Sequence, residues 1–520
     1  MVFQNNGRPI PGPWINPVLV FSFAAALVLV RLLSGFFWPI PLQLDEAQYL
    51  GWSRDLALGY YSKPPMISWV VAGNTHTCSF FGLNFLEACT RFSQPLALGL
   101  ATLFAGLASW HLFKNKAVAL SSILLLITSP LFGFYSIFAT TDAWLLLFWS
   151  AAFWFFSSAS QSEEPAFGLW ASCGLCVGLG LLAKYSMVIF VLSALIWLIS
   201  QRRIWTTGPW IAAVIGLLVF APNFVWNAAQ GFPTIIHHAE ISQAGSLGKS
   251  TWSFGKSLGS IFEFSVAQFL MIGPLALGWV IFRGLWRSVL VSAHNAASRM
   301  LLIFSLPMMS VMLLQAFISR ANANWAAPAF ITLAIYVSWL WFGGQQRAPK
   351  KPMVWLWLTV FFGLLLSVTL IALPKISFYT QGPFEIRAIE KLRGWREAAL
   401  RAKEIASENS FAILAEDRAM LAALHAYAPN IKVPIYAFDS LNRRQNHYTW
   451  FQNIKDLTPQ QDQGILLLTF QEPHDALLSR LGLTLIRQFE DPTLQRILIG
   501  DGKITPLTYE LRPKAKQHGS

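Results

Sequence analysis

Charged residues are scarce in this sequence. Only 12% of its 520 residues are Asp, Glu, Lys or Arg, whereas about a quarter is usual in a soluble protein. Hydrophobic residues make up 55% of the chain. The low charge excludes an ordinary soluble domain and indicates a polytopic α-helical membrane protein.

Cysteine is also scarce, with two residues, Cys173 and Cys176, inside an apolar run and two others, Cys78 and Cys89, in the first long loop. Although a Cys-x-x-Cys pair suggests redox or zinc chemistry, small residues packed between helices explain this pair better. For Cys78 and Cys89 the sequence leaves a disulfide open.

A signal-peptide cleavage site is missing after the first apolar segment, residues 17–39. The segment therefore predicts a retained membrane helix. Arg31 lies within it, and its side chain either snorkels to the interface or faces a polar cavity. We favour snorkelling.

Eleven apolar runs are long enough to be membrane helices, and the basic clusters between them test that number. The predicted helices span residues 18–38, 94–112, 117–136, 140–158, 168–183, 185–200, 209–222, 262–282, 299–318, 326–343 and 353–373. With the N-terminus inside, this path places the Lys and Arg clusters on the cytoplasmic side. The net charge of +13 is therefore a topology signal, and nucleic acid is excluded as a partner.

The same path divides the chain into two predicted domains, a membrane domain over residues 1–373 and a C-terminal domain over residues 374–520. Two loops of the membrane domain, residues 39–93 and 223–260, fall on the external side. In the tail, helical patterns at residues 386–408 and 416–427 alternate with strand-like runs at residues 411–414, 464–469, 483–487 and 495–499. This alternation predicts a small external α/β domain.

Polar residues suited to chemistry gather on this external side. Asp45 and Glu46 follow the first helix, Asp142 begins an apolar helix, and Lys184 separates two apolar runs. Helix capping would explain Asp142 and snorkelling would explain Lys184. Their coincidence on one side of a chain poor in charge favours a functional site.

Several motifs occur in order: Asp-Glu-Ala-x-Tyr at Asp45, Tyr-x-x-Lys-Pro-Pro at Tyr60, Thr-Thr-Asp-Ala at Thr140, Gly-Leu-x-Leu-Leu-Ala-Lys-Tyr at Gly178 and Asn-x-x-Trp-Asn at Asn223. Together they resemble the bacterial GT-C glycosyltransferases of the PMT type, families 39 and 83. This superfamily of dolichyl-phosphate-mannose protein mannosyltransferases includes the transferase that adds aminoarabinose to lipid A. The similarity covers residues 39–328.

The resemblance implies an inverting transferase that moves a monosaccharide from a polyprenyl-phosphate donor to lipid A, lipopolysaccharide or another envelope glycan. It places the enzyme in the bacterial inner membrane among membrane lipids, with the active site facing the periplasm. A protein O-mannosyltransferase is a sibling alternative, and a flippase of lipid-linked sugar is an alternative of another class. No internal repeat supports a transporter.

Residue roles follow from the same resemblance. Asp45 is the expected base, and Asp142 is the second acidic residue of the catalytic pair, which positions the first external loop or the substrate. Substrate-binding residues are expected among the polar groups of the external turns: Glu46, Tyr49, Lys63, Lys184, Arg320 and Asn324.

A divalent metal is the one cofactor that the resemblance implies, with His238 as a ligand. Relatives carry a carboxylate before Lys-Pro-Pro that helps to hold the metal, whereas this chain has Ser62 there. The alternative for His237 and His238 is an ordinary surface position.

Overall fold

The computed structural model describes residues 15–162, 165–242, 253–273, 276, 278, 295–343, 351–380, 392–438, 446–454, 464–470, 483–488, 493 and 507–513. The chain packs as two compact units. The first comprises Met1–Phe37, Lys63–Ile67 and Arg91–Ala372, and the second comprises Trp38–Ser62, Ser68–Thr90 and Leu373–Ser520. The first external loop is thus grouped mainly with the C-terminal segment.

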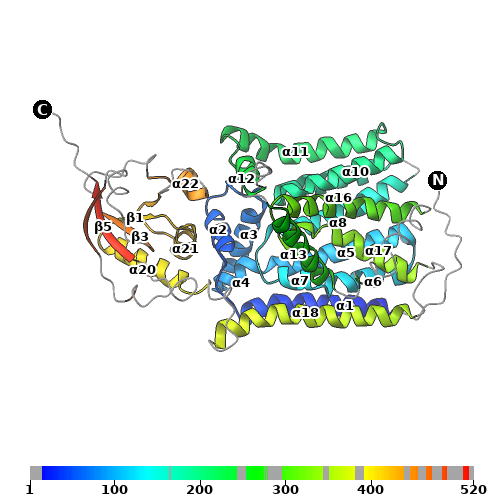
Figure 1. Cartoon of the computed structure of the whole chain (residues 1–520), viewed down its shortest axis with the longest axis horizontal. Coiled ribbons are helices and arrows are strands. Elements are labelled where there is room, and N and C mark those ends of the chain that lie inside the picture. Colours follow the sequence, from blue (N-terminus) through cyan, green and yellow to red (C-terminus); the bar gives the residue numbers. More distant parts are fainter. Residues whose placement is uncertain are drawn as a thin grey trace. The chain divides into compact units, whose positions relative to one another are not determined.

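The first unit is a bundle of apolar helices (Figure 1). Its helices are α1 (Pro17–Phe37), α5 (Ser93–Phe113), α6 (Lys116–Ile127), α7 (Pro130–Tyr135), α8 (Thr141–Gln161), α9 (Phe167–Ala183), η1 (Tyr185–Met187), α10 (Val188–Ser200), α11 (Thr207–Ala229), α12 (Pro233–Ser242), α13 (Phe254–Ile272), α16 (Ala296–Ile318), η3 (Ala323–Ala326), α17 (Ala329–Phe342) and α18 (Pro352–Thr380).

Among the described residues, six helices are long and apolar enough to cross a membrane, and four shorter apolar helices accompany them. Each predicted membrane helix has a helical counterpart. The helix predicted over residues 262–282 is represented by α13, which begins earlier, at Phe254; much of the rest of that prediction lies outside the described residues. The polytopic helical architecture is confirmed.

The helix predicted over residues 117–136 is divided into α6 and α7. Thr128 and Ser129 turn their hydroxyls back to the carbonyls of Leu124 and Leu126, at 2.7 and 2.8 Å. Pro130 then has no N–H to continue the helix, and the Ser129 hydroxyl caps α7 by accepting from the Phe132 N–H.

Hydrogen bonds within the first unit link helix ends that the charge pattern assigns to one side. Asn115, between α5 and α6, donates to the Phe342 carbonyl at the end of α17, at 3.0 Å. Arg203 donates to the Ser160 carbonyl near the end of α8, at 2.6 Å. These contacts agree with the alternating path deduced from the basic clusters.

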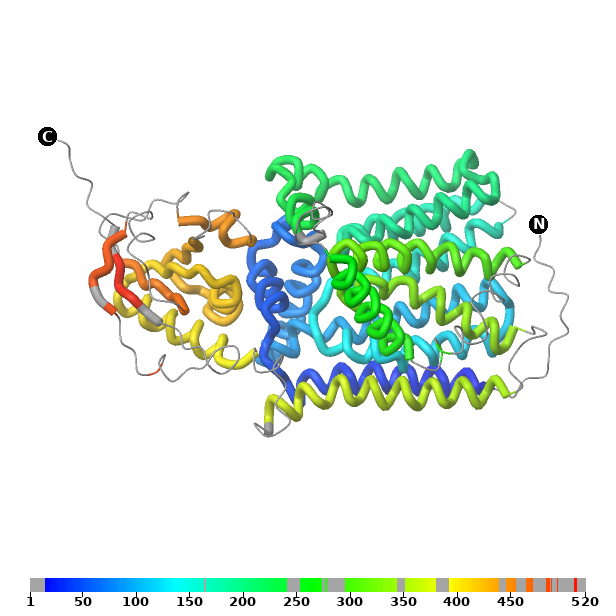
Figure 2. Tube along the Cα trace, in the orientation of Figure 1, coloured from blue at the N-terminus to red at the C-terminus, as the bar shows by residue number. Residues whose placement is uncertain are grey.

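The prediction that Arg31 snorkels is wrong. Arg31 is only 5% exposed. Its guanidinium donates to the Ile127 carbonyl at 2.7 Å and to the Ser367 hydroxyl at 3.4 Å. Helices α1 and α18 run side by side here (Figure 2). Arg31 thus satisfies a carbonyl at the C-terminus of α6, where a cation is electrostatically favoured.

Small residues bring α9 and α11 into close contact. A Cβ atom on Gly174 would lie 2.3 Å from the carbonyl oxygen of Ala212, so only glycine fits there. Cys173 and Cys176 are free and buried on the same helix, which confirms that the pair packs between helices.

The second unit combines the loop helices with a small α/β fold. Its elements are α2 (Leu44–Trp52), most of α3 (Met66–Phe80) and α4 (Leu86–Arg91), then α20 (Trp395–Glu408), β1 (Ala412–Ala415), α21 (Arg418–Tyr427), β2 (Ile435–Ala437), α22 (His447–Phe451), β3 (Ile465–Thr469), β4 (Leu483–Gln488) and β5 (Leu507–Pro513).

The strands form one mixed sheet in the order β2-β1-β3-β5-β4. β1 pairs in parallel with β2 and β3, whereas β5 pairs antiparallel with β3 and β4. The predicted strands near 411–414, 464–469 and 483–487 are present, while β2 and β5 were not predicted. The strand predicted at 495–499 lies outside the described residues.

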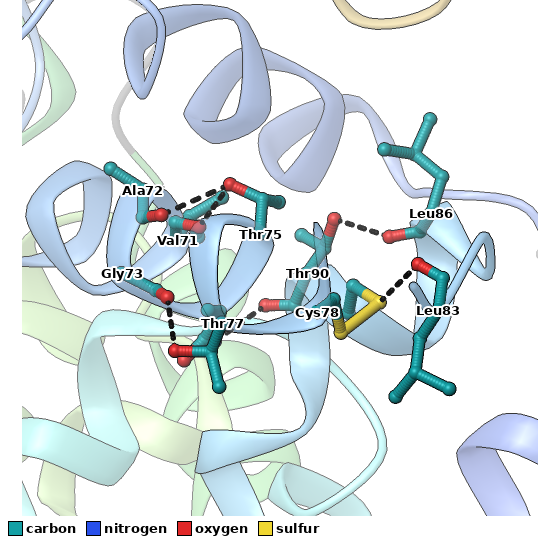
Figure 3. Close-up of a disulfide and its surroundings, with 11 residues drawn as sticks. Val71, Ala72, Gly73, Thr75, Thr77, Cys78, Leu83, Leu86 and Thr90 are labelled. Carbon is teal, nitrogen blue, oxygen red and sulfur yellow. Dashed lines mark hydrogen bonds between the residues drawn. A yellow bond between two sulfur atoms is a disulfide. The ribbon is translucent and has the colours of Figure 1, made fainter. Parts of the chain in front are cut away.

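A disulfide joins Cys78 at the end of α3 to Cys89 in α4 (Figure 3). Beside it, the Asn74 side chain donates to the Thr90 carbonyl at 3.3 Å, and the Leu83 N–H donates to the Cys78 carbonyl at 2.9 Å. The bridge closes a loop that carries the exposed aromatic residues Phe80 and Phe81.

We expect the disulfide to be formed in the native protein, since such bonds persist on the oxidising side of a membrane. In a Cys173→Ser/Cys176→Ser background, a maleimide reagent should label the unfolded protein only after reduction. Replacing Cys78 by Ser should lower the free energy of unfolding by about 2–4 kcal/mol. Labelling without reductant would contradict the pairing.

Candidate active site

The core of the site in the first unit is a buried ion pair between Asp142 and Lys184. The Lys184 ammonium lies 2.8 Å from Asp142 Oδ1, and the two side chains are 18% and 5% exposed. Asp142 stands in the first turn of α8, and Lys184 is the extended residue between α9 and η1. The pairing replaces the capping and snorkelling alternatives for these two residues.

Asn324 supplies the second hydrogen-bond donor to the Asp142 carboxylate. Its amide nitrogen donates to Asp142 Oδ2 at 3.0 Å, so each carboxylate oxygen has a donor. The turn that carries Asn324 is fixed by Gln268 of α13, which donates to the Ala323 carbonyl at 3.0 Å. With both oxygens engaged, Asp142 is better suited to hold other groups in place than to accept a proton.

A second network immobilises the residue after Lys184. The Tyr185 hydroxyl donates to Asn223 Oδ1 at 2.8 Å and accepts from Asn227 Nδ2 at 3.1 Å. Both asparagines belong to the Asn-x-x-Trp-Asn motif near the end of α11. The motif therefore locks Tyr185, and through it the backbone that presents Lys184.

Positive charge dominates the surroundings of His238 on α12. The pKa of His238 is lowered to about 4 by desolvation and by the charges of Lys63, His237 and Lys184. His238 is an exposed residue, which agrees with the alternative of a surface position, and water offsets part of the desolvation. The imidazole is neutral at pH 7, and the local charge comes from the two lysines.

Three buried polar atoms beside the first turn of α8 have no hydrogen-bond partner among the described residues: Gln94 Nε2, Thr140 Oγ1 and Trp144 Nε1. Gln94 is fully buried, and its Oε1 accepts from the Thr140 N–H at 3.4 Å. Buried polar groups are normally satisfied by protein, water or ligand. Near Asp142 the bundle therefore holds three donor groups that the described residues leave unsatisfied.

Asp45 lies in the second unit, in the first turn of α2. Its Oδ1 accepts from Arg418 Nη2 at 2.7 Å, and its side chain is 49% exposed. Gln48, one turn further along α2, accepts from Arg418 Nε at 3.1 Å. The predicted base is thus half-exposed and held by a residue of the C-terminal segment.

The structure gives Glu46 and Tyr49 local partners. Glu46 is 1% exposed and accepts from the Gln43 N–H at 2.9 Å, completing a capping box at the start of α2. Tyr49 is 4% exposed and packs against Trp52 with ring centres 5.7 Å apart. These contacts orient α2 and therefore the Asp45 beside them.

Of the predicted residues, the first unit brings Asp142, Lys184 and Asn324 into direct contact. His238 interacts electrostatically with Lys63 and Lys184. Arg320 is exposed in the turn four residues before Asn324. Asp45, Glu46 and Tyr49 share α2 in the second unit.

Metal-ligand chemistry is not evident in this site. Among the described residues, no three His, Cys, Asp or Glu side chains gather closely enough to hold a metal ion. The charged neighbours of His238 are cationic, which disfavours a divalent cation. Within the described part of the chain, no set of residues therefore fits the metal that the resemblance implied.

Sequence reasoning missed the contacts of Gln94 and Tyr185 in the first unit and the contact of Arg418 with Asp45 and Gln48 in the second. The motif residues Tyr185, Asn223 and Asn227 were visible in order, but their joint hydrogen bonding was not. Arg418 lies far from Asp45 in sequence and carries no local signal, because it begins an ordinary amphipathic helix.

The lowered pKa of His238 predicts acid sensitivity. Because its folded pKa of about 4 lies below the unfolded value of 6.5, stability should fall as the pH drops from about 6.5 towards 4. His238→Gln should reduce this loss of thermal stability, measured as the unfolding midpoint at each pH. Lys63→Ala should also make this loss smaller, since it removes a charge that lowers the folded pKa and so brings that pKa closer to the unfolded value; identical pH profiles would contradict the assignment.

Residues 62–226 match the family described as dolichyl-phosphate-mannose-protein mannosyltransferase. This range contains Lys63, Asp142, Lys184 and Asn223.

Among curated proteins, the chain is similar to the lipid A galacturonosyltransferase RgtD of Rhizobium johnstonii, with 28% identity over 83% of this chain and 86% of that protein. It is also similar to the undecaprenyl phosphate-alpha-4-amino-4-deoxy-L-arabinose arabinosyl transferase of an Enterobacter species, with 27% identity over 42% of this chain and 41% of the other.

Among solved structures, the fold is similar to that of ArnT from Cupriavidus metallidurans bound to undecaprenyl phosphate. The TM-score is 0.57 at 16% identity, covering 95% of this chain and 97% of the other. At this identity the likeness establishes a shared fold.

Proposed function

We propose that this chain, a membrane glycosyltransferase of the GT-C type similar to ArnT, moves a monosaccharide from a polyprenyl phosphate to lipid A or another part of lipopolysaccharide. The reaction takes place at the periplasmic face of the bacterial inner membrane. The carrying observation is the Asp142–Lys184–Asn324 cluster, with Lys63 nearby, at one end of an apolar helix bundle. The pattern of Lys and Arg predicts that this end is external.

The charge of this cluster fits the donor. Lys63 and Lys184 with the carboxylate of Asp142 and a neutral His238 leave one net positive charge. A sugar joined to a lipid through a phosphodiester carries one negative charge. As the sugar departs, the phosphate gains a second negative charge, which fixed ammonium groups stabilise more strongly than the first.

Asp142 and Asn324 prepare Lys184 for this task. A lysine beside hydrocarbon would otherwise turn towards water. The carboxylate balances the charge of the ammonium and fixes its direction, and Asn324 keeps the carboxylate in place. Lys184 can thus contact the donor phosphate without a large change of rotamer.

Asp45 is proposed as the general base. It would accept the proton of the acceptor hydroxyl while that oxygen bonds to the anomeric carbon and the bond from this carbon to the phosphate oxygen breaks. The polyprenyl phosphate leaves with the electron pair and needs no acid. Attack from the face opposite the phosphate inverts the anomeric configuration. The half-exposed carboxylate of Asp45 suits the role of base better than the enclosed carboxylate of Asp142.

The extended similarity to a lipid A galacturonosyltransferase makes a uronic acid the first donor sugar to test. The match to protein mannosyltransferases over residues 62–226 makes O-mannosylation of protein the second candidate. Mass spectrometry of lipid A, lipopolysaccharide and envelope proteins from a deletion strain separates them, because only the true acceptor loses the mass of one sugar.

Replacing Asp45 by Asn should lower transfer by about 10²–10⁴-fold, the usual contribution of a general base. The assay measures transfer from a polyprenyl-phosphate sugar to lipid A by purified enzyme. Asp55→Asn, an exposed acid on the same loop, is the matched control and should retain activity. Full activity in Asp45→Asn would contradict the assignment of Asp45 as general base.

Replacing Lys184 by Ala should weaken donor binding by about tenfold to a hundredfold, because a charge-assisted hydrogen bond to the phosphate is lost. Inhibition by polyprenyl phosphate alone measures this loss. The double variant Asp142→Asn/Lys184→Ala avoids leaving Asp142 buried without a counter-ion. Lys116→Ala, an exposed lysine at the opposite end of the bundle, is the control. Unchanged inhibition would exclude Lys184 as a phosphate ligand.

A further inference from the structure

Arg418 is the residue outside the motifs that contacts the predicted base directly. It is the first residue of α21, and its Nη2 lies 2.7 Å from Asp45 Oδ1. Its Nε donates to Gln48 Oε1 at 3.1 Å, and Nη2 contacts the same oxygen. The planar guanidinium of Arg418 therefore binds the side chains of Asp45 and Gln48, which are one turn apart on α2.

Further contacts fix α2 on α21. The Leu42 N–H, just before α2, donates to the Tyr427 hydroxyl at 3.0 Å. Arg54, just after α2, donates to the carbonyls of His425 and Ala426. A Cβ atom on Gly51 would lie 3.0 Å from His425 Cβ, so the two helices approach closely. The backbone of α2 is thus anchored independently of Arg418.

Helix stability does not explain the position of Arg418. A cation in the first turn of a helix opposes the helix dipole. The cap is already supplied by Asp417, whose Oδ1 accepts from the N–H groups of Ala419 and Met420 at 2.7 and 3.0 Å. The pair with Asp45 is 36% and 49% exposed, and ion pairs at that exposure add little to stability.

We propose that Arg418 is a positioning residue for the transfer reaction, holding the Asp45 carboxylate in the orientation in which it accepts a proton. The inference rests on the proposed role of Asp45 as base. Arg418 engages Oδ1, and Oδ2 is the oxygen that takes the proton from the acceptor hydroxyl. Gln48 fixes the guanidinium in turn. The C-terminal segment thereby contributes to catalysis as well as to folding.

The test measures kcat and KM for donor and acceptor separately in Arg418→Ala, Arg418→Gln and Arg418→Lys, together with the unfolding midpoint. We expect kcat of Arg418→Ala to fall about 10- to 100-fold, with donor KM and the unfolding midpoint nearly unchanged. Arg418→Lys should recover part of kcat, and added guanidinium ion should partly restore Arg418→Ala. Arg401→Ala, which removes an exposed i,i+3 pair with Glu404 in the same unit, should retain activity.

A double variant separates this inference from the proposed function. If Arg418 acts through Asp45, then Asp45→Asn/Arg418→Ala should be no slower than Asp45→Asn alone. An active Asp45→Asn would overturn the proposed base itself. An inactive Asp45→Asn with a fully active Arg418→Ala would overturn only the role of Arg418. A lowered unfolding midpoint with no rescue by lysine or guanidinium would also overturn it, because it would reveal a purely structural role.

Discussion

The buried pair of Asp142 and Lys184 is the interaction on which the functional end of the helix bundle depends. In a chain with so few charges, each ionised group beside hydrocarbon must be compensated. The pair does this with one direct contact and one amide donor from Asn324. Three separate parts of the bundle, the start of α8, the end of α9 and η3, are tied together by this one carboxylate. Removing either charge would leave the other uncompensated.

Around this pair, neutral side chains fix the positions of the backbone segments that carry Lys184 and Asn324. Tyr185 is held by Asn223 and Asn227, and Gln268 fixes the turn that carries Asn324. Amides and hydroxyls cost less to bury than charges and still impose direction. Such a frame holds the ion pair of Lys184 and Asp142 in place at the end of an apolar helix bundle.

The second unit also holds an acid in an ion pair, that of Asp45 with Arg418, but this pair is partly exposed. Asp45 is held by Arg418, while Glu46, its neighbour, is buried and caps α2. Two adjacent acids with similar chemistry thus receive different tasks from their surroundings. One carboxylate is half-exposed in an ion pair, and the other is buried and caps the helix that carries both.

Composition, hydrophobic run length and the placement of Lys and Arg determined the membrane architecture, because these are averages over many residues and tolerate local error. Motifs with short spacing, such as Thr-Thr-Asp-Ala, indicated Asp142 and Lys184 from the sequence alone. The break between α6 and α7 and the burial of Arg31 were decided by tertiary structure, since each depends on hydrogen bonds to a particular neighbour. Strands β2 and β5 were likewise missed because their hydrogen-bond partners come from distant segments. Only the folded chain could reveal that Arg418, 373 residues after Asp45, meets its carboxylate, because no local pattern encodes a contact between distant side chains.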